Sequence, residues 1–199
     1  MFKRLNRQER VLVERWLSPS APSWGLTAVT EAARGGALWL GGAAGLALWP
    51  GRWRAGARDA AVAVAVASGF AHLIGHVLVR QRPAASRLPA YEAMTHKPTS
   101  PSFPSAHAAV AAAFTTALTR RTGAAGLVMV PVAGAVAYSR VRTRAHWPSD
   151  VVVGIGHGVV VGEVVHRLMS GIVNFSAARE RRPPRSLEAG RDALSRHRL

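Results

Sequence analysis

The sequence predicts an all-α protein, an integral membrane helical bundle of about five transmembrane helices preceded by an amino-terminal amphipathic helix. Three observations support this prediction. Five apolar runs rich in Ala, Val and Gly recur along the 199 residues and are separated by short basic segments. The charged residues, 26 Lys and Arg against 10 Asp and Glu, lie mostly between or beyond these runs. Cysteine is absent, which excludes disulfide bridges, thiolate metal sites and cysteine nucleophiles.

The composition also excludes two classes of protein. A formal net charge of +16 accompanies 49% hydrophobic residues, whereas a disordered basic chain is poor in apolar residues. A nucleic-acid-binding domain carries such a charge without apolar runs of bilayer length. We therefore expect the basic residues to face a membrane bilayer with anionic headgroups, and we expect no nucleic-acid partner.

The amino-terminal segment, residues 1–23, begins with a predicted basic amphipathic helix over residues 1–17. Apolar side chains alternate there with five basic ones. This pattern is typical of a helix that lies on a membrane surface. The alternative is a helix that packs on the bundle and keeps its other face in water. A Ser- and Pro-rich linker, residues 18–23, follows.

The central segment, residues 24–176, holds the five apolar runs and forms the predicted membrane-embedded domain. The clearest run, residues 60–79, carries no formal charge and as a helix rises about 30 Å, the thickness of the hydrocarbon core. The alternative is a soluble helical bundle, whose helices show a polar face every turn; this run shows none. The other predicted spans are residues 35–49 (extended through 27–34 or Pro50), 106–119, 124–138 and 151–165.

Two polar segments complete the chain. Residues 81–104 form the longest polar stretch between spans and contain five prolines. A loop of this length inside a compact domain is usually functional or disordered. The tail, residues 177–199, carries seven arginines, and we expect it to be mobile and to contact anionic headgroups.

Three short motifs fall at the ends of predicted spans. They are Arg82-Pro83, then Pro104-Ser105-Ala106-His107, then Ser139-Arg140 followed by His146 and Asp150. Spans that alternate in direction bring all these ends to one face of the membrane. We therefore expect the three motifs to form a single site.

The residue types in these motifs suit the binding of a phosphate group. Two guanidinium groups, Arg82 and Arg140, are able to fork onto phosphate oxygens. Pro104-Ser105 predicts a helix start with Ser105 at or near the N-cap, where free backbone N–H groups and the helix dipole bind anions. His107 follows in the first turn of this helix, beside the expected anion.

The third motif contains a candidate nucleophile. His146 and Asp150 lie four residues apart, and Pro148 indicates that a helix starts between them. Asp150 is then placed to accept the Nδ1 proton of His146 and to leave Nε2 facing phosphorus. This is the arrangement of a nucleophile oriented by a third group.

Together the motifs resemble those of the type 2 phosphatidic acid phosphatase superfamily, which also includes vanadium haloperoxidases and glucose-6-phosphatases. The family pattern is K-x6-R-P, then P-S-G-H, then S-R-x5-H-x3-D. The sequence matches every fixed position of the third block, has Ala106 in place of glycine in the second, and matches only Arg82-Pro83 of the first. Gly75 stands where the family has lysine. His76 and Arg80 are the candidates to substitute for this lysine in part.

The resemblance, which covers about residues 60–165, implies a role for each matched residue. It implies that His146 attacks phosphorus to form a phosphohistidine, that Asp150 orients and stabilises His146, and that His107 protonates the leaving group. It implies that the phosphate oxygens are held by Arg82, Arg140, Ser105 and the backbone N–H of Ala106. It implies no metal and no other cofactor.

As a function, the resemblance implies a lipid phosphatase of the cell (plasma) membrane, which hydrolyses a phosphomonoester or pyrophosphate on a lipid phosphate substrate. A polyprenyl phosphate-type lipid is favoured, and a phosphatidic acid-type lipid is the other candidate. Two alternatives come from different classes. One is a vanadate-dependent haloperoxidase-like enzyme, which a halide-oxidation assay would distinguish. The other is a catalytically degenerate membrane module, suggested by the missing lysine.

Two further pairs of residues have a second interpretation. His72 and His76 lie four apart on an apolar helix, where such a pair is able to bind metal; hydrogen bonding between helices is the favoured interpretation. Arg142 and Arg144 either bind substrate or headgroups, or belong to a solvated basic loop.

Two orientations of the membrane domain place comparable numbers of cations in the cytoplasm. One puts the basic amino-terminal helix and the active-site loops inside the cell; the other, which we favour, has an extracytoplasmic active site. With five spans, this orientation places the arginine-rich tail and the basic turns at residues 52–58 and 120–121 in the cytoplasm, as the positive-inside rule requires. A tag on the carboxyl terminus should then resist protease added outside intact cells. Cleavage of the tag under those conditions would contradict this orientation.

Overall fold

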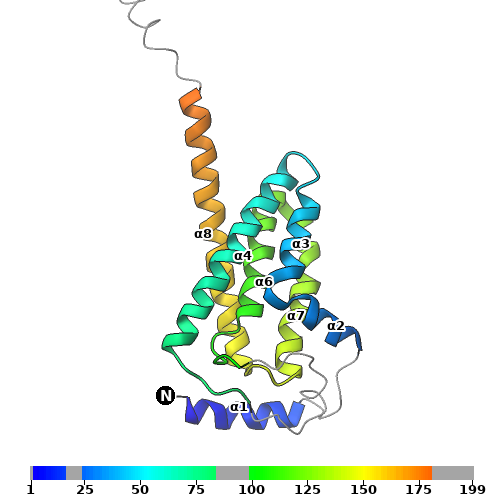
Figure 1. Ribbon diagram of the computed structural model, residues 1–199, viewed down its shortest axis with the longest axis vertical. Coiled ribbons are helices and arrows are strands. Elements are labelled where there is room, and N and C mark those ends of the chain that lie inside the picture. Colours follow the sequence, from blue (N-terminus) through cyan, green and yellow to red (C-terminus); the bar gives the residue numbers. More distant parts are fainter. Residues whose placement is uncertain (1, 17–23, 84–98, 181–199) are drawn as a thin grey trace, which may run out of the picture. The chain divides into compact units, whose positions relative to one another are not determined.

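The computed structural model describes residues 2–16, 24–83 and 99–180, and every regular element in these ranges is a helix (Figure 1). The all-α prediction is confirmed for this part of the chain. The predicted linker, most of the 81–104 loop and the tail beyond residue 180 lie outside the described residues. The elements are α1 (Lys3–Trp16), α2 (Trp24–Ala32), η1 (Arg34–Gly36), α3 (Ala37–Leu46), α4 (Arg52–Val77), α6 (Ala106–Thr122), η2 (Gly123–Met129), α7 (Val130–Arg142) and α8 (Pro148–Glu180).

Three stretches are long and apolar enough to cross a membrane. They are Arg52–Val77, Ala106–Arg142 and Pro148–Arg179, of which the second contains α6, η2 and α7. The count of five transmembrane helices stays a prediction. The chain divides into two compact units, Met1–His166 and Arg167–Leu199, and the following description concerns the first.

Paired glycines interrupt the first predicted span. Gly35 and Gly36 have φ angles of 60° and 80°, a left-handed conformation that glycine adopts at little cost and that a continuous α-helix does not allow. The segment expected to form one long helix is therefore two short ones, α2 with 9 residues and α3 with 10.

Helix α4 begins earlier than the apolar run predicts, because an ion cluster accommodates its charged start. Asp59 is fully buried and accepts hydrogen bonds from Arg121 of α6, at 3.0 Å from Nε and 2.7 Å from Nη2. His166 of α8 places Nδ1 3.4 Å from the same carboxylate. This cluster joins three helices at the end of the bundle where α4 begins and α6 ends.

The helices pack as a bundle whose outer surface is apolar. Helix α6 lies against α4 and α7, α3 lies against α4, and α2 contacts α7 (Figure 1). The rings of Trp39 and Phe114 join α3 to α6 with their centroids 5.2 Å apart. Large exposed apolar side chains on α4 and α8, such as Phe70 and Val152, suit contact with lipid rather than water. The membrane interpretation is thus favoured over a soluble bundle.

A glycine every fourth residue on α8 allows close packing against α6. A Cβ atom placed on Gly154 would lie 2.5 Å from the carbonyl oxygen of Ser105, and one on Gly162 would lie 2.7 Å from that of Ala113. A Cβ on Gly158 would overlap the carbonyl oxygen of Ala109. Small residues at such spacing permit helix backbones to approach each other in membranes.

The alternation of helix directions brings the three motifs to one end of the bundle, as predicted. The backbone N–H of Ser105, at the start of α6, donates to the carbonyl oxygen of Asp150 in the first turn of α8 at 3.0 Å. Arg80, which follows α4, donates to the Asp150 carboxylate at 2.5 Å. The end of α7 adjoins the same group through the 143–147 turn.

We expect Gly158→Ala to destabilise the protein by about 1–3 kcal/mol, because the added methyl group forces α8 away from α6. Gly156→Ala is the matched control, since a Cβ there meets nothing within 4 Å. Thermal unfolding in detergent micelles measures the difference. Equal melting temperatures for the two variants would contradict the close packing of these helices.

Candidate active site

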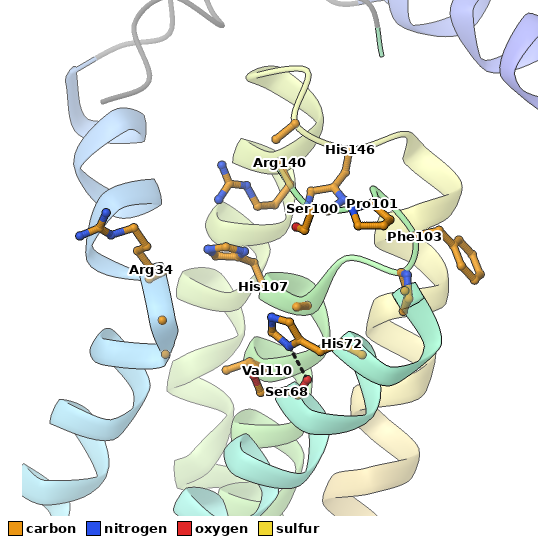
Figure 2. A pocket seen from close by; sticks show the side chains of 18 of the residues that line it. Arg34, Ser68, His72, Ser100, Pro101, Phe103, His107, Val110, Arg140 and His146 are labelled. Atoms are coloured by element: carbon orange, nitrogen blue, oxygen red, sulfur yellow. Dashed lines mark hydrogen bonds between the residues drawn. The ribbon is translucent and has the colours of Figure 1, made fainter. Parts of the chain in front are cut away.

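A cavity of about 300 Å³ opens where the three motifs meet (Figure 2). Its wall includes residues from α2 and η1, from α4, from the segment before α6, and from the end of α7. Five of the seven predicted site residues line it: Arg82, Ala106, His107, Arg140 and His146. The other two, Ser105 and Asp150, are fully buried outside the lining.

Ser105 is the N-cap of α6, as the sequence predicts. Its backbone is extended (φ −73°, ψ 104°), and its hydroxyl oxygen accepts a hydrogen bond from the N–H of Ala108 at 3.5 Å. Because the hydroxyl caps the helix, the cavity wall is formed by the next two residues, Ala106 and His107. These residues carry two of the backbone N–H groups that a helix start leaves without an intrahelical partner.

His146 is held with one ring nitrogen toward the backbone and the other toward a cation. Nδ1 lies 2.6 Å from the carbonyl oxygen of Ser102, and Nε2 lies 3.3 Å from Nη1 of Arg82. A carbonyl oxygen only accepts hydrogen bonds, so Nδ1 carries the proton and the lone pair of Nε2 faces Arg82 Nη1. This is the tautomer that a nucleophilic Nε2 requires.

Asp150 does not make the predicted hydrogen bond to His146. Its Oδ2 lies 3.8 Å from Nδ1, and the Ser102 carbonyl oxygen takes the position expected for the carboxylate. Oδ2 instead accepts from the backbone N–H of Trp147 at 2.9 Å, and Oδ1 accepts from Arg80. Sequence reasoning missed Ser102, because no side-chain pattern marks a residue that acts through its carbonyl group.

Arg82 joins two segments that border the cavity. Nε donates to the carbonyl oxygen of Ser100 at 2.9 Å, and Nη2 donates to that of Pro101 at 3.2 Å. Nη1 donates to the carbonyl oxygen of Ala145, next to His146. The guanidinium group is thus fixed beside the candidate nucleophile. Arg140, in the last turn of α7, lines the same cavity as His107 and His146 (Figure 2).

The position of the missing lysine lies in the cavity wall. A Cβ atom on Gly75 would be 3.2 Å from the carbonyl oxygen of Phe103, so this part of the wall is tight. Of the two candidate substitutes, His76 lines the cavity and Arg80 does not. Arg80 instead forms ion pairs with Asp150 and with Glu9 of α1. Of the two alternatives, Arg80 is therefore excluded and His76 stays a candidate.

The histidine pair on α4 also lines the cavity. Nδ1 of His72 lies 2.7 Å from the carbonyl oxygen of Ser68 (Figure 2). Nδ1 of His76 lies 2.7 Å from the carbonyl oxygen of His72. These hydrogen bonds are within α4 rather than between helices, which corrects the favoured interpretation. Within the described residues, no group of three or more His, Cys, Asp or Glu side chains is arranged to hold a metal ion.

Arg144 is a buried contact and not part of a solvated loop. It is 8% exposed, has a φ angle of 57°, and directs Nη2 to the carbonyl oxygen of Val13 in α1 at 3.4 Å. Helix α1 therefore packs against the loop that carries His146. This agrees with the alternative in which the amino-terminal helix packs on the bundle.

Burial and charge favour the neutral form of the His146 imidazole. Burial is the largest influence and lowers the pKa of His146; Asp150 acts in the opposite direction, and the Arg82 and Arg140 guanidinium groups add to the lowering. A neutral imidazole keeps its Nε2 lone pair. The His146 ring therefore stays neutral at a pH where an ordinary histidine would be partly protonated, which suits its predicted role as a nucleophile.

The sequence is similar to a known family and to curated relatives over more than half of its length. The model of the PAP2 superfamily matches residues 56–173. Two curated relatives, from Mycobacterium tuberculosis strains CDC 1551 / Oshkosh and ATCC 25618 / H37Rv, are each 38% identical over 107 residues. Both are named decaprenylphosphoryl-5-phosphoribose phosphatase, and the match covers 53% of this chain and 57% of each relative. No solved structure matches the chain.

We expect the pKa of His146 to lie below the ordinary imidazole value of about 6.5, because burial lowers it. The rate at which diethyl pyrocarbonate modifies neutral His146, followed by mass spectrometry across pH, gives the midpoint. Arg82→Gln removes one cation that lowers this pKa and should move the midpoint to higher pH. Arg121→Gln, at the other end of the bundle, should leave it in place.

A midpoint at or above the ordinary imidazole value in the native protein would contradict this account of the site. An unchanged midpoint in Arg82→Gln would contradict the influence of that guanidinium group.

Proposed function

The chain belongs to the PAP2 superfamily, and on this basis we propose that it is a membrane-embedded phosphoric ester hydrolase acting on a lipid phosphate. The observation that carries the proposal is the cavity that brings His146, His107, Arg82 and Arg140 together from four segments of the chain. This set supplies a nucleophile, a proton donor and two cations that suit a phosphate group.

In the proposed first step, Nε2 of His146 attacks the phosphorus atom. A P–N bond forms, the P–O bond to the leaving group breaks, and His107 gives a proton to the leaving oxygen. The Ser102 carbonyl oxygen, 2.6 Å from Nδ1, holds the reactive tautomer. Arg82 and Arg140 bind the phosphate oxygens and stabilise the charge that develops on them.

In the proposed second step, water attacks the phosphohistidine while His107 accepts a proton from that water. The P–N bond breaks, phosphate is released, and His146 returns to its starting state. Asp150, 3.8 Å from Nδ1, stabilises the positive imidazole ring of the intermediate. In these two steps the protein supplies only side-chain and backbone groups, and neither step uses a metal ion.

The proposed substrate is a polyprenyl-type lipid phosphate whose leaving group bears hydroxyls, such as a sugar. The names of the two relatives support a polyprenyl lipid. The cavity supports a polar leaving group, because its α2, η1 and α4 walls carry side chains that accept or donate hydrogen bonds. These are Thr30, Glu31, Arg34, Ser68, His72 and His76.

We also propose the placement of the chain in the plasma membrane. Five crossings would come from the broken α2–α3 segment, from α4, from α6 and α7 as separate crossings, and from α8. Residues 24–176 would form the embedded domain, with the active site on the extracytoplasmic side. The segment of residues 1–23 and the tail of residues 177–199 would lie outside the hydrocarbon core.

We expect His146→Ala to reduce phosphate release by at least about 10³-fold, because loss of a nucleophile removes the covalent route. His157→Ala is the matched control, since this α8 histidine does not line the cavity. Purified protein in detergent is assayed with a polyprenyl-phosphoryl sugar phosphate, a polyprenyl phosphate and phosphatidic acid, each with and without a chelator. The first substrate should be hydrolysed fastest.

Full activity in His146→Ala, or loss of native activity on addition of the chelator, would contradict the proposed mechanism. Faster hydrolysis of phosphatidic acid would contradict the proposed substrate class and leave the mechanism intact.

A further inference from the structure

Arg80 is a buried arginine that the proposed mechanism does not use. Its side chain is 0% exposed. Nη1 donates to Ser149 Oγ at 2.6 Å and to Asp150 Oδ1 at 2.5 Å. Nη2 donates to Glu9 Oε2 at 2.6 Å, and Asn6 Oδ1 accepts from Nη2 at 2.7 Å and from Nε at 2.9 Å. Such complete pairing is what a buried guanidinium group requires, because an unpaired buried charge is costly.

Two aromatic rings further restrict the guanidinium group. Its central carbon lies 5.0 Å from the ring centroid of Phe2 and 5.4 Å from that of Trp147. Phe2 precedes α1, and Trp147 lies next to His146 in the turn before α8. These contacts add cation–π attraction and hold Arg80 between the amino-terminal helix and the loop of the candidate nucleophile.

Arg80 fixes the orientation of the Asp150 carboxylate. Oδ1 is bound by Arg80, while Oδ2 accepts from the Trp147 N–H at 2.9 Å and lies 3.8 Å from Nδ1 of His146. The carboxylate is unable to rotate without breaking one of these hydrogen bonds. The distance between Asp150 and the imidazole ring therefore depends on Arg80, although Arg80 is absent from the cavity wall.

Glu9 extends this network to α1 and adds a second negative charge to it. Its Oε2 pairs with Arg80, and its Oε1 accepts from the backbone N–H of Ser149 at 2.8 Å. Arg80 alone would cancel the charge of Asp150. With Glu9 included, the three side chains carry a net charge of −1 (two carboxylates and one guanidinium). This negative cluster acts on the His146 ring against the Arg82 and Arg140 guanidinium groups, and it favours the positively charged ring of a phosphohistidine.

We propose that Arg80 and Glu9 are positioning residues for the Asp150–His146 pair, so that α1 is a working part of the active site. Neither residue belongs to the three sequence motifs. The kinetic readout of this inference rests on the proposed phosphatase function, whereas a second, chemical readout does not.

The kinetic test compares Arg80→Lys, Arg80→Gln and Glu9→Gln with native protein, using a polyprenyl-phosphoryl sugar phosphate. We expect kcat to fall about tenfold or more in Arg80→Gln and Glu9→Gln, with KM changed less than kcat, because the phosphate-binding residues are intact. Arg80→Lys keeps the charge and should retain more activity than Arg80→Gln. Rates are expressed per folded monodisperse protein, measured by size-exclusion chromatography in detergent.

Arg121→Lys is the matched control, because Arg121 also pairs with a buried carboxylate, Asp59, at the other end of the bundle. It should leave kcat within about twofold of native once folded protein is counted. Native kcat in both Glu9→Gln and Arg80→Gln, or an equal fall in Arg121→Lys, would overturn the proposal. If the Arg80 variants do not fold, the Glu9→Gln result decides.

The chemical test measures the modification of His146 by diethyl pyrocarbonate at a fixed pH. Loosening of Asp150 and its loop should raise this rate severalfold in Glu9→Gln and Arg80→Gln and leave it unchanged in Arg121→Lys. A rate equal to native in both variants would overturn the proposal even if the native protein hydrolyses none of the lipids. If the native protein hydrolyses none of the lipids but the modification rate is raised in Glu9→Gln and Arg80→Gln, the proposed function is contradicted and the positioning role is not.

Discussion

The end of the bundle that holds the candidate active site depends on one buried carboxylate, Asp150. Its two side-chain oxygens bind Arg80 and the backbone N–H of Trp147, and its carbonyl oxygen accepts from the N–H of Ser105. Asp150 thereby joins the segment after α4, the turn before α8 and the start of α6. These are the segments that place Arg82, His146 and the α6 N-terminus around one cavity. A shift of Asp150 would move the proposed nucleophile, His146, and the start of α6 together.

Some of the many arginines in this basic chain pair with its few buried acidic side chains. Among the described residues, three carboxylate side chains are buried, those of Glu9, Asp59 and Asp150. Each pairs with an arginine from a different part of the chain, Arg80 for two of them and Arg121 for the third. The few acids thus hold the helices together at both ends. At the end that holds the candidate site, Arg82 and Arg140 instead border the cavity, and the proposed function assigns them to a phosphate group.

The sequence predicts the local features of the site and leaves its long-range contacts unidentified. The N-cap at Ser105 and the spacing that puts His146 just before α8 involve residues three or four apart, which local patterns reveal. The hydrogen bond from His146 to the carbonyl oxygen of Ser102 spans 44 positions, and the ion pair between Arg80 and Glu9 spans 71. Neither follows from a helical period or a motif. The break before α3 is a local feature that the sequence does not reveal either, because glycine is also frequent within membrane helices.

The central claim is that His146 becomes covalently phosphorylated during turnover, and direct trapping tests it. Purified protein is mixed with a polyprenyl-phosphoryl sugar phosphate labelled with radioactive phosphorus in the reacting group, quenched within the first turnovers in alkali, and digested. The account predicts that the label appears on the peptide that contains His146 and is absent from the His146→Ala protein. Steady release of labelled phosphate with no label on that peptide, or equal labelling of both proteins, would contradict it.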